Sequence, residues 1–465
     1  MNVKLYIKGM LYTVLLFTLS SLTSCRDSFL EVKPSTDIVS PKTLDDYQQM
    51  LDFFRINYSS ALPLLASDEY VIANENDWLS LSLIERNSYI WASDLFEGQN
   101  NVEDWNYSYE SVFYANSVIT GMKNLKRTEG NKNKYDYILG QAYFIRAFAF
   151  FDLAKNFAAP YDVENASTTL GIPLRLSPNV DEIAERANLE DTYLQIFADL
   201  QMATNLLSSE ITANRNRANR PAAYALGARI SLSMRQYPLA EKYADSCLHM
   251  YDKLIDYNTI NVTATTPFLR DNVENLINAN IGKNYQSILY NSPKNITVSS
   301  LLLGLYASGD LRKEIYFTYS PVNGLTKMKR GYSGATLLPY SGLSTDEVYL
   351  IKSECAARRN DLVVASQYLN RLLVNRFRTG NYVNRVFFSY EEAIDVIINE
   401  RRKELVWRSG LRWDDIRRLN LEGKEIQLER SFGDKKYTLF PGSKKFVFPI
   451  PSNELNNSKI TQNIR

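Results

Sequence analysis

Residues 400–418 read ERRKELVWRSGLRWDDIRR, a helical pattern in which many charged residues lie among apolar ones. The isoleucines before this stretch and Leu405 within it form one apolar helical stripe, and Arg401 falls on the same stripe. A buried guanidinium needs a partner, because an unpaired buried charge is very costly. Glu354 lies on the apolar stripe of its own helix. We therefore predict a buried ion pair between Arg401 and Glu354; the alternative is that Arg401 binds a ligand carboxylate.

Two segments upstream repeat each other in spacing. Each contains a tyrosine, an alanine 16 residues later and a second tyrosine 3 residues after that. A small residue at a helix crossing, flanked by tyrosines, is typical of tetratricopeptide-type hairpins. Two unrelated helical hairpins are the alternative. The repeated positions are Tyr224, Ala240 and Tyr243 in the first segment and Tyr349, Ala365 and Tyr368 in the second.

Helical periodicity dominates the rest of the chain. The pattern predicts helices at 105–125, 135–157 and 191–207, and strands at 436–440 and 445–450. Long loops are expected at 62–103, 257–298 and 317–345, and loops of that length inside a compact protein are usually functional. We expect a mostly α fold in which tetratricopeptide-like helical hairpins form a scaffold, with long loops and a few short strands.

The first 25 residues have the composition of a secretory signal. Lys4 and Lys8 precede an apolar run, which ends in Leu22-Thr23-Ser24-Cys25. Leu-x-Ser-Cys resembles a bacterial lipobox, in which the cysteine is acylated and the chain is cut just before it. We predict a lipoprotein signal peptide at 1–24 and lipidation at Cys25, which would tether the chain to a membrane without crossing it. The alternative is a transmembrane anchor, for which the apolar run is short.

Composition excludes several classes of function. The chain has 53 basic and 52 acidic side chains without a long run of one sign, so nucleic acid is not an expected partner. Its one histidine, His249, argues against imidazole metal sites and against Ser-His or Cys-His catalysis, and we expect it at a surface or helix end. Cys247 and Cys355 lie in apolar helical patterns and are predicted to be buried free thiols. No catalytic residue, metal or cofactor is expected.

The stretch 400–418 resembles the C-terminal hallmark of the SusD/RagB family of outer-membrane nutrient-binding lipoproteins. Other stretches match motifs of that family in the expected order along nearly the whole mature chain, with Ser353 in place of a usual alanine. The chain is short for the family. The matching stretches are Phe29-Leu30-Glu31-Val32-Lys33-Pro34; Trp105, Tyr109 and Asn116; Gly171-Ile172-Pro173-Leu174; Asp310-Leu311-Arg312; residues 347–354; Phe448-Pro449-Ile450-Pro451; and Gln462-Asn463.

The resemblance implies a single SusD-like domain at 25–465, with an N-terminal part at about 25–300 and a C-terminal part at about 301–465. It also implies a lipid-anchored protein on the cell surface of the outer membrane. Such proteins capture a nutrient, usually a glycan and sometimes a peptide, and deliver it to a SusC-like TonB-dependent transporter. They do not act as enzymes.

Sugar binding requires exposed aromatic faces beside amides and carboxylates that hydrogen-bond hydroxyl groups. The segment 67–101 has this mixture, and a second aromatic group includes Tyr285, Tyr332 and Tyr340. For each aromatic residue, packing in the core is the alternative, and we assign Trp105, Trp407 and Trp413 to packing. The predicted ligand-binding residues are Asp68, Tyr70, Asn76, Trp78, Trp91, Phe96, Asn101 and Tyr290.

Three other functions compete with glycan capture. The first is a RagB-like import component that binds peptide, which would need backbone-pairing or charged grooves. The second is a helical glycosidase, which needs two carboxylates facing each other across the scissile bond. The third is a lipoprotein that assists barrel assembly, which would lack long aromatic loops. The carboxylates that could serve a glycosidase are Asp68, Glu69, Glu75 and Asp77.

Overall fold

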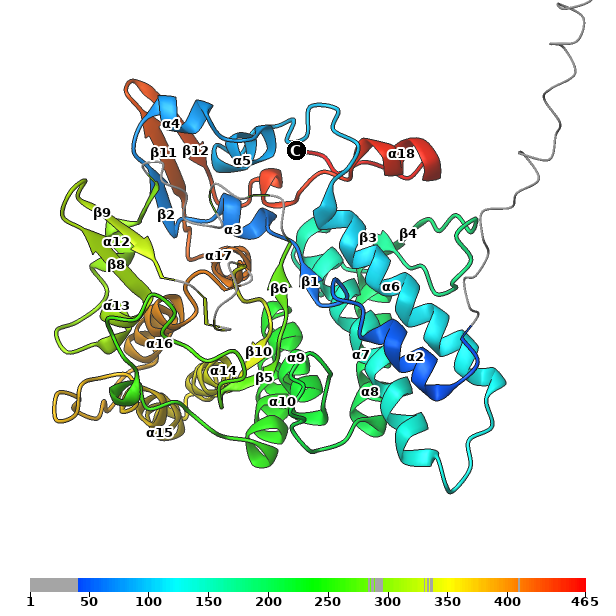
Figure 1. Ribbon diagram of the computed structural model, residues 1–465. Helices are drawn as coiled ribbons and strands as arrows, with labels where there is room; N and C mark the ends of the chain where they lie inside the picture. Colours follow the sequence, from blue (N-terminus) through cyan, green and yellow to red (C-terminus); the bar gives the residue numbers. More distant parts are fainter. Residues whose placement is uncertain are drawn as a thin grey trace, which may run out of the picture. The chain divides into compact units, whose positions relative to one another are not determined.

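A computed structural model describes residues 41–282, 285, 288, 296–329, 331, 332, 334, 338–408 and 410–465. The predicted signal peptide, the lipidation site Cys25 and the predicted ligand residue Tyr290 lie outside this part of the chain. The described part is mostly helical, with short two-stranded sheets between the helices (Figure 1). The predicted fold class is therefore confirmed.

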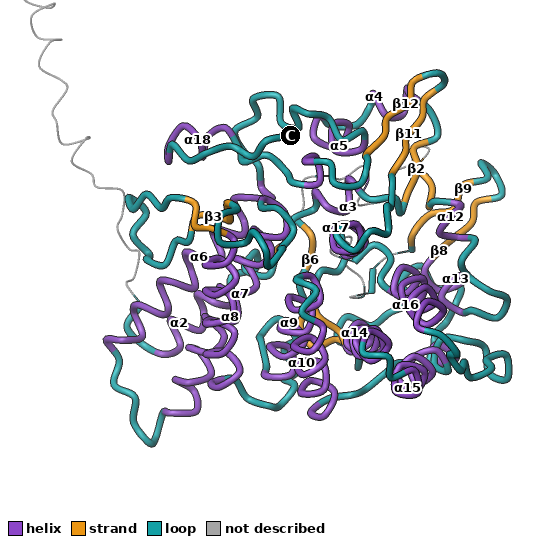
Figure 2. The backbone as a smooth tube through the Cα atoms, turned by 180° about the vertical axis from the view of Figure 1, so that it is seen from behind, coloured by secondary structure: helices purple, strands orange, loops and turns teal. Residues whose placement is uncertain are grey.

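The three long helices predicted from periodicity are present, with ends shifted by a few residues. They are α6 (Glu103–Gly121), α7 (Lys132–Phe157) and α8 (Leu189–Leu206). α8 begins near the predicted cap because the Asn188 side chain accepts the backbone N–H of Asp191. α7 packs against both α6 and α8, and the three lie side by side in both views of the backbone (Figures 1 and 2).

The two repeated segments form helical hairpins. They are α9 (Arg220–Ser233) with α10 (Tyr237–Met250), and α14 (Thr345–Arg358) with α15 (Leu362–Leu373). Ala240 and Ala365 are fully buried at the two crossings, as the repeat predicted. Each hairpin turns through a residue in the left-handed region, Arg235 in the first and Asn360 at the equivalent place in the second. α10 packs against α14, so the hairpins are stacked (Figure 1).

The remaining helices, most of them shorter, join these hairpins to the rest of the chain. The α-helices are α2 (Leu44–Leu51), α3 (Leu62–Ala66), α4 (Glu75–Leu79), α5 (Leu83–Tyr89), α12 (Ser300–Leu303), α13 (Leu311–Tyr316), α16 (Tyr390–Glu404), α17 (Leu411–Asn420) and α18 (Ser452–Ser458). The 3-10 turns are η2 (Met122–Asn124), η3 (Tyr257–Thr259) and η4 (Lys444–Phe446).

Each sheet of the described residues has two strands. β1 (Tyr58–Ser59) pairs in parallel with β6 (Asn280–Ile281). The antiparallel pairs are β2 (Tyr70–Ile72) with β7 (Ile296–Val298), β3 (Leu170–Pro173) with β4 (Arg186–Asn188), β5 (Asn275–Ile277) with β10 (Leu343–Ser344), β8 (Phe317–Ser320) with β9 (Leu325–Met328), and β11 (Leu428–Phe432) with β12 (Lys435–Leu439).

Two expectations about strands and loops are corrected. The predicted strand at 436–440 is β12, but the one at 445–450 is wrong, because this segment contains η4 and Pro449, and the Phe448 N–H donates to the carbonyl of Asn156 instead of to a strand. The expected loop at 62–103 contains α3, β2, α4 and α5. Most of its apolar residues are buried, although Val71 and Leu79 are exposed, and short helices satisfy the backbone groups there.

Residues 400–418, the charged stretch, form the last third of α16, a tight turn and most of α17. Arg401 and Glu354 are both buried and ion-paired, but not with each other. Arg401 Nε lies 2.9 Å from Asp415 of α17, and Nη2 lies 3.5 Å from Glu347. Glu354 instead accepts from Arg418, at 2.6 Å. The predicted pair is therefore wrong in its partners, because α17 folds back beside α16 and supplies a closer carboxylate to Arg401 and a closer guanidinium to Glu354.

More buried ion pairs surround this turn. Arg312 of α13 is fully buried and lies 2.7 Å from Asp310, 2.7 Å from Glu400 and 3.0 Å from Glu404. Arg376 is also fully buried and pairs with Glu404 at 2.7 Å. Glu404 therefore receives two guanidinium groups from different parts of the chain.

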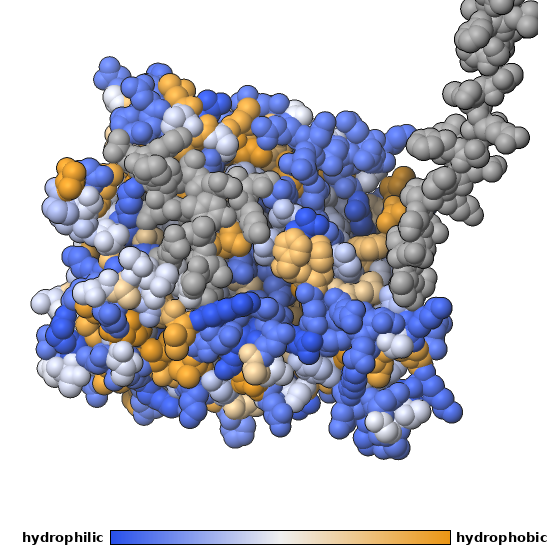
Figure 3. All heavy atoms as spheres, in the orientation of Figure 1, coloured by the Kyte–Doolittle hydropathy of each residue, from blue (hydrophilic) through white to orange (hydrophobic). Residues whose placement is uncertain are grey.

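Smaller sequence predictions are also tested by the structure. Cys247 and Cys355 are buried free thiols, and His249 is exposed in the last turn of α10, as expected. Among the described helices, none combines the length and the apolar character needed to span a bilayer. On the face drawn in Figure 3, hydrophobic side chains form separate patches among hydrophilic ones.

A substitution at Gly410, which precedes α17, tests how closely α17 packs on α3. The φ of Gly410 is +64°, and a Cβ there would lie 2.2 Å from the Cβ of Pro63. Gly410→Ala should therefore lower the free energy of unfolding by about 2–4 kcal/mol, through strain and overlap together. Urea denaturation of the variant and of wild type measures the difference in the free energy of unfolding.

Gly423→Ala is the matched control. Its φ is +80°, but no atom lies within 4 Å of the added Cβ. It should cost only the strain of the left-handed backbone, about 1 kcal/mol. Equal losses for the two variants would contradict close packing of α17 on α3.

Candidate functional site

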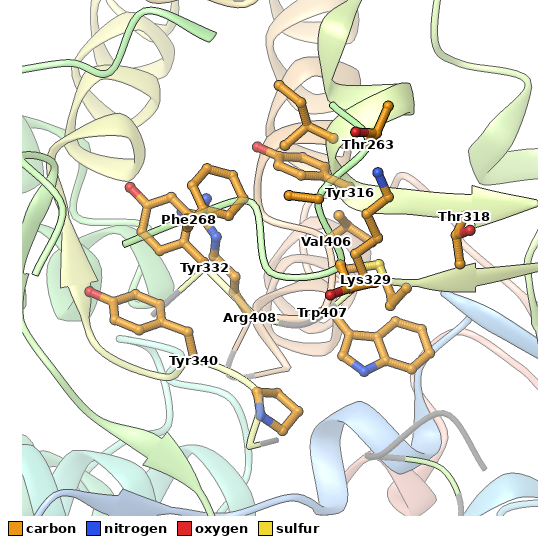
Figure 4. A pocket seen from close by; sticks show the side chains of 16 residues that line it. Thr263, Phe268, Tyr316, Thr318, Lys329, Tyr332, Tyr340, Val406, Trp407 and Arg408 are labelled. Carbon is orange, nitrogen blue, oxygen red and sulfur yellow. The ribbon is translucent and has the colours of Figure 1, made fainter. Parts of the chain in front are cut away.

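An aromatic cavity of about 290 Å³ opens beside the turn that joins α16 to α17. The rings of Phe268, Tyr316, Tyr332 and Tyr340 line one side, and Trp407 of the turn lines another (Figure 4). The rings come from segments far apart in the sequence, which the ion pairs around α16 bring together. The cavity thus presents aromatic ring faces beside the threonine residues Thr263, Thr265 and Thr318, a mixture expected of a small-molecule or sugar site.

Hydrogen bonds and ring contacts fix the aromatic side of the cavity. The Tyr332 hydroxyl donates to Glu274 at 2.5 Å, and the Tyr340 hydroxyl donates to the Leu343 carbonyl at 2.8 Å. The ring of Tyr332 lies 5.1 Å from those of both Tyr340 and Phe268, between centroids. These side chains are therefore held in place before any ligand arrives, which lowers the entropic cost of binding.

Arg408 forms the charged part of the cavity wall. Its guanidinium lies 3.6 Å from the centroid of the Tyr332 ring, and Nη1 lies 2.5 Å from the Asp346 carboxylate. Its Nη2 is buried and has no hydrogen-bond partner among the described residues. Burial raises the pKa of Asp346 to about 7, against the opposing effect of Arg408. The unused donor on Arg408 can bind an acceptor atom of a ligand.

A second hollow of about 640 Å³ continues the cavity over the β8–β9 hairpin. Thr263, Thr318 and Lys329 line both hollows. Lys329 Nζ donates to the carbonyl of Glu314 at 2.7 Å and to that of Val262. Tyr319 lines the second hollow and is 64% exposed. We call the two hollows together the aromatic groove; their continuity allows a ligand longer than one ring to bind.

The predicted ligand residues are only partly placed on open surface. Tyr332 and Tyr340 of the second aromatic group line the aromatic groove. Tyr70, Trp91 and Phe96 are buried in the core, so their predicted role as sugar platforms is corrected. The Trp91 indole N–H donates to the Ala66 carbonyl at 3.0 Å, as expected of a satisfied core residue.

Tyr285 is buried, and its hydroxyl donates to Asp104 at 2.6 Å. Asn76 and Asn101 are exposed. Trp78 is half-buried, and its ring centroid lies 5.3 Å from that of Phe432. Ligand contact by Asn76, Trp78 and Asn101 stays a prediction.

The carboxylates considered for a glycosidase are already engaged. Asp68 is bound by Arg402 and Arg412, each at 2.8 Å. Burial alone would raise the pKa of Asp68, but the two guanidinium groups hold it well below its usual range. Glu75 pairs with Lys435 at 2.5 Å, and the Asp77 carboxylate accepts from the side-chain amide of Asn74, the N-cap residue of α4, at 2.6 Å. Asp68 therefore serves as an ion-pair partner and not as a free ligand-binding carboxylate.

Sequence reasoning missed several residues of the groove. They are Phe268, Tyr316, Thr318, Tyr319, Lys329 and Arg408. The signal that could have found most of them is their place in or beside the long loops expected at 257–298 and 317–345. Arg408 lies within residues 400–418, and the sequence of that stretch does not show which of its arginines faces a cavity.

The buried carboxyl of Glu69 gives a pH prediction. Burial raises its pKa to about 7. Its Oε1 accepts the Trp407 N–H at 2.8 Å, and its Oε2 lies 3.2 Å from the Ser67 hydroxyl, which also lies 3.0 Å from the Leu64 carbonyl. A protonated Glu69 can donate to Ser67 while Ser67 donates to Leu64, so the neutral form fits the site.

Because the pKa of the folded state exceeds the usual 4.5, the unfolded chain loses this proton first, and stability falls as pH rises from 4.5 to 7. A glutamine has the same shape and no proton to lose. Glu69→Gln should match wild type near pH 4.5 and be more stable by up to about 3 kcal/mol at pH 8, measured by urea denaturation at both values. A difference that does not change with pH would contradict the raised pKa.

Comparisons with known proteins agree with this architecture. Residues 28–232 match a family model described as starch-binding and associating with the outer membrane, and residues 345–465 match the SusD family model. The two matches together span more than two thirds of the chain. None of the curated proteins compared with the chain matches it.

Several solved structures share the fold. A SusD superfamily protein from Bacteroides thetaiotaomicron superposes with a TM-score of 0.73 at 21% identity, covering 91% of this chain and all of that one. A SusD-like carbohydrate binding protein from Bacteroides vulgatus has a TM-score of 0.67 at 18% identity, over 90% of this chain and 97% of that one. Surface glycan-binding protein A from Bacteroides fluxus has a TM-score of 0.66 at 17% identity, over 91% of this chain and 99% of that one.

Proposed function

This chain belongs to the SusD/RagB family, and we propose that it binds a glycan at the outer membrane and delivers it, chemically unaltered, to a SusC-like TonB-dependent transporter. The family model described as starch-binding supports the cargo class, and so do the printed names of two proteins with the same fold, a carbohydrate binding protein and a surface glycan-binding protein.

The aromatic groove is the observation that carries this proposal. The exposed ring of Tyr319 and the ring faces that line the cavity can stack on the C–H faces of sugar rings, while threonine hydroxyls and the free N–H of Arg408 bind sugar hydroxyls. The groove continues past the first cavity over β8 and β9, a length that favours an oligosaccharide over a monosaccharide. A peptide is the alternative cargo, because Lys313, Lys329 and Arg408 also line the groove and could bind its carbonyl or carboxylate groups.

The proposed function does not include cleavage of a glycosidic bond, because the carboxyl groups considered for that reaction are already engaged. A glycosidase needs one carboxylic acid and one carboxylate facing the bond that breaks. Asp68, Glu75 and Asp77 are held in ion pairs or a helix cap, and Glu69 is fully buried. The one carboxylate that lines the groove, Glu314, pairs with Arg378 at 2.7 Å.

A substitution at Tyr319 tests the role of the groove without destabilising the fold. Because its ring is 64% exposed and lines the second hollow, Tyr319→Ala should weaken binding of the cognate glycan about tenfold, as loss of one stacking ring would. Glycan-array screening first identifies the glycan, and affinity electrophoresis or calorimetry then measures the change.

Phe388→Ala is the matched control, because Phe388 is 84% exposed and does not line the groove. It should leave affinity unchanged. If both variants bind as wild type does, the groove is not the glycan site, and the surface with Asn76, Trp78 and Asn101 becomes the next one to test.

The lipid anchor needs a separate test. We propose that Cys25 is acylated, since a lipobox-like Leu-x-Ser-Cys follows a signal-like segment. Cys25→Ala should move the chain from the membrane fraction to the soluble fraction and abolish incorporation of labelled palmitate. Cys247→Ala, at a buried thiol, should change neither result. Labelling that survives in Cys25→Ala would contradict this anchor.

A further inference from the structure

A second cavity, of about 520 Å³, lies outside the aromatic groove and shares no residue with it. It is formed by the segment after α7, the last turn of α17, the segment around η4 and the C-terminal residues 461–464. We call it the tail cavity. Its apolar wall consists of Ala159, Pro160, Leu170, Leu421, Phe446, Val447 and Ile464.

Two guanidinium groups line the tail cavity without a carboxylate partner among the described residues. Arg417 is 5% exposed; its Nη2 donates to the Ala158 carbonyl at 2.6 Å, its Nη1 donates to the Lys155 carbonyl, and its Nε has no hydrogen-bond partner in the described chain. Arg186 donates to the carbonyls of Gly171 and Thr461, at 2.8 and 2.9 Å.

The charge of these two groups is only partly offset, since the carboxylate of Asp414 acts on Arg417 without forming an ion pair within 4 Å. The carbonyls that they bind lie partly at the C-terminal end of α7, where a helix carries only about half a negative charge. The one carboxylate that lines the cavity, Asp162, is already paired with Arg235 at 3.2 Å. Lys444 adds a third cation at the exposed rim.

Burial opposes this arrangement, since it lowers the pKa of Arg186 to about 10 and also lowers the pKa of Arg417. Both groups nevertheless remain protonated at neutral pH. An arginine so placed in a dry site is stabilised by an anion that reaches its unused N–H, and planar guanidinium groups suit carboxylate, sulfate and phosphate.

We propose that the tail cavity is a second binding site, which takes a small organic anion with an apolar body. The head group binds between Arg417 Nε and Arg186, and the apolar part packs on Leu170, Leu421 and Phe446. The volume lies within the range of sites that hold a small-molecule ligand. This site does not depend on the glycan proposal, because no residue is common to the two.

The test compares two probes of the same shape, 2-naphthoate and its neutral analogue 2-naphthamide. Titration calorimetry on the purified full-length chain should show that naphthoate binds at least tenfold more tightly. Arg186→Gln should weaken naphthoate binding at least tenfold and leave naphthamide binding unchanged. Arg186→Lys, which keeps the charge, should retain a preference for the anion.

Lys424→Gln, at an exposed lysine that does not line the cavity, is the control and should bind both probes as wild type does. Because Arg186 also holds backbone carbonyls, Lys444→Gln at the exposed rim provides a second variant, with an expected loss of about threefold for naphthoate only. Equal affinity for the two probes, or no binding of either, would overturn the proposal. So would loss of naphthoate binding in Tyr319→Ala, because the probe would then occupy the aromatic groove.

Discussion

Buried guanidinium–carboxylate pairs around α16 and α17 are the constraint on which the rest of this structure depends. Removing one partner of such a pair leaves an uncompensated charge and costs about 3–5 kcal/mol, although the intact pair adds little to stability compared with apolar packing. The pairs therefore act mainly by excluding other arrangements. The pairs that Arg312 and Arg376 form with Glu404, Arg401 with Asp415, and Arg418 with Glu354 require α13, α14, α16 and α17 to be aligned as observed.

The same pairs set the shape of the aromatic groove. Arg408 lies in the cavity wall because Asp346, at the start of α14, holds its Nη1. Trp407 lies beside it with a φ of +62°, a conformation that costs energy and that the bond from its N–H to Glu69 helps to maintain. Asp346 and Glu69 thus hold two residues of the groove in place, which suits a site that recognises a ligand by fixed geometry.

The sequence predicted the helices well and the site poorly, for physical reasons. Long helices carry a periodic apolar signal, and the spacing shared by Ala240 and Ala365 indicated two equivalent crossings, which the structure confirms. The apolar stripe showed that Arg401 needs a carboxylate, but any acidic residue on a neighbouring helix satisfies that requirement. The choice of Asp415 over Glu354 depends on the sharp turn before α17, and that turn depends on tertiary packing.

Aromatic residues present the same difficulty. Trp91 and Tyr319 both lie in segments rich in polar residues, yet one is buried and the other is 64% exposed. Composition describes a segment's average environment, whereas the exposure of one ring depends on which short helices form around it. α3, α4 and α5 cover the rings of 62–103, and the β8–β9 hairpin leaves Tyr319 uncovered.

Strongly shifted pKa values often mark catalytic sites, and here they mark a scaffold. Glu69 and Asp346, whose pKa values burial raises to about 7, do not line the aromatic groove. Each is held by a backbone or side-chain group of the α16–α17 turn, so its proton cannot reach a ligand in the groove. The groove itself offers ring faces, hydroxyls and cationic N–H groups, and such groups hold a sugar but do not cleave it. The proposed release of the cargo intact is consistent with this separation of titrating carboxyls from the groove.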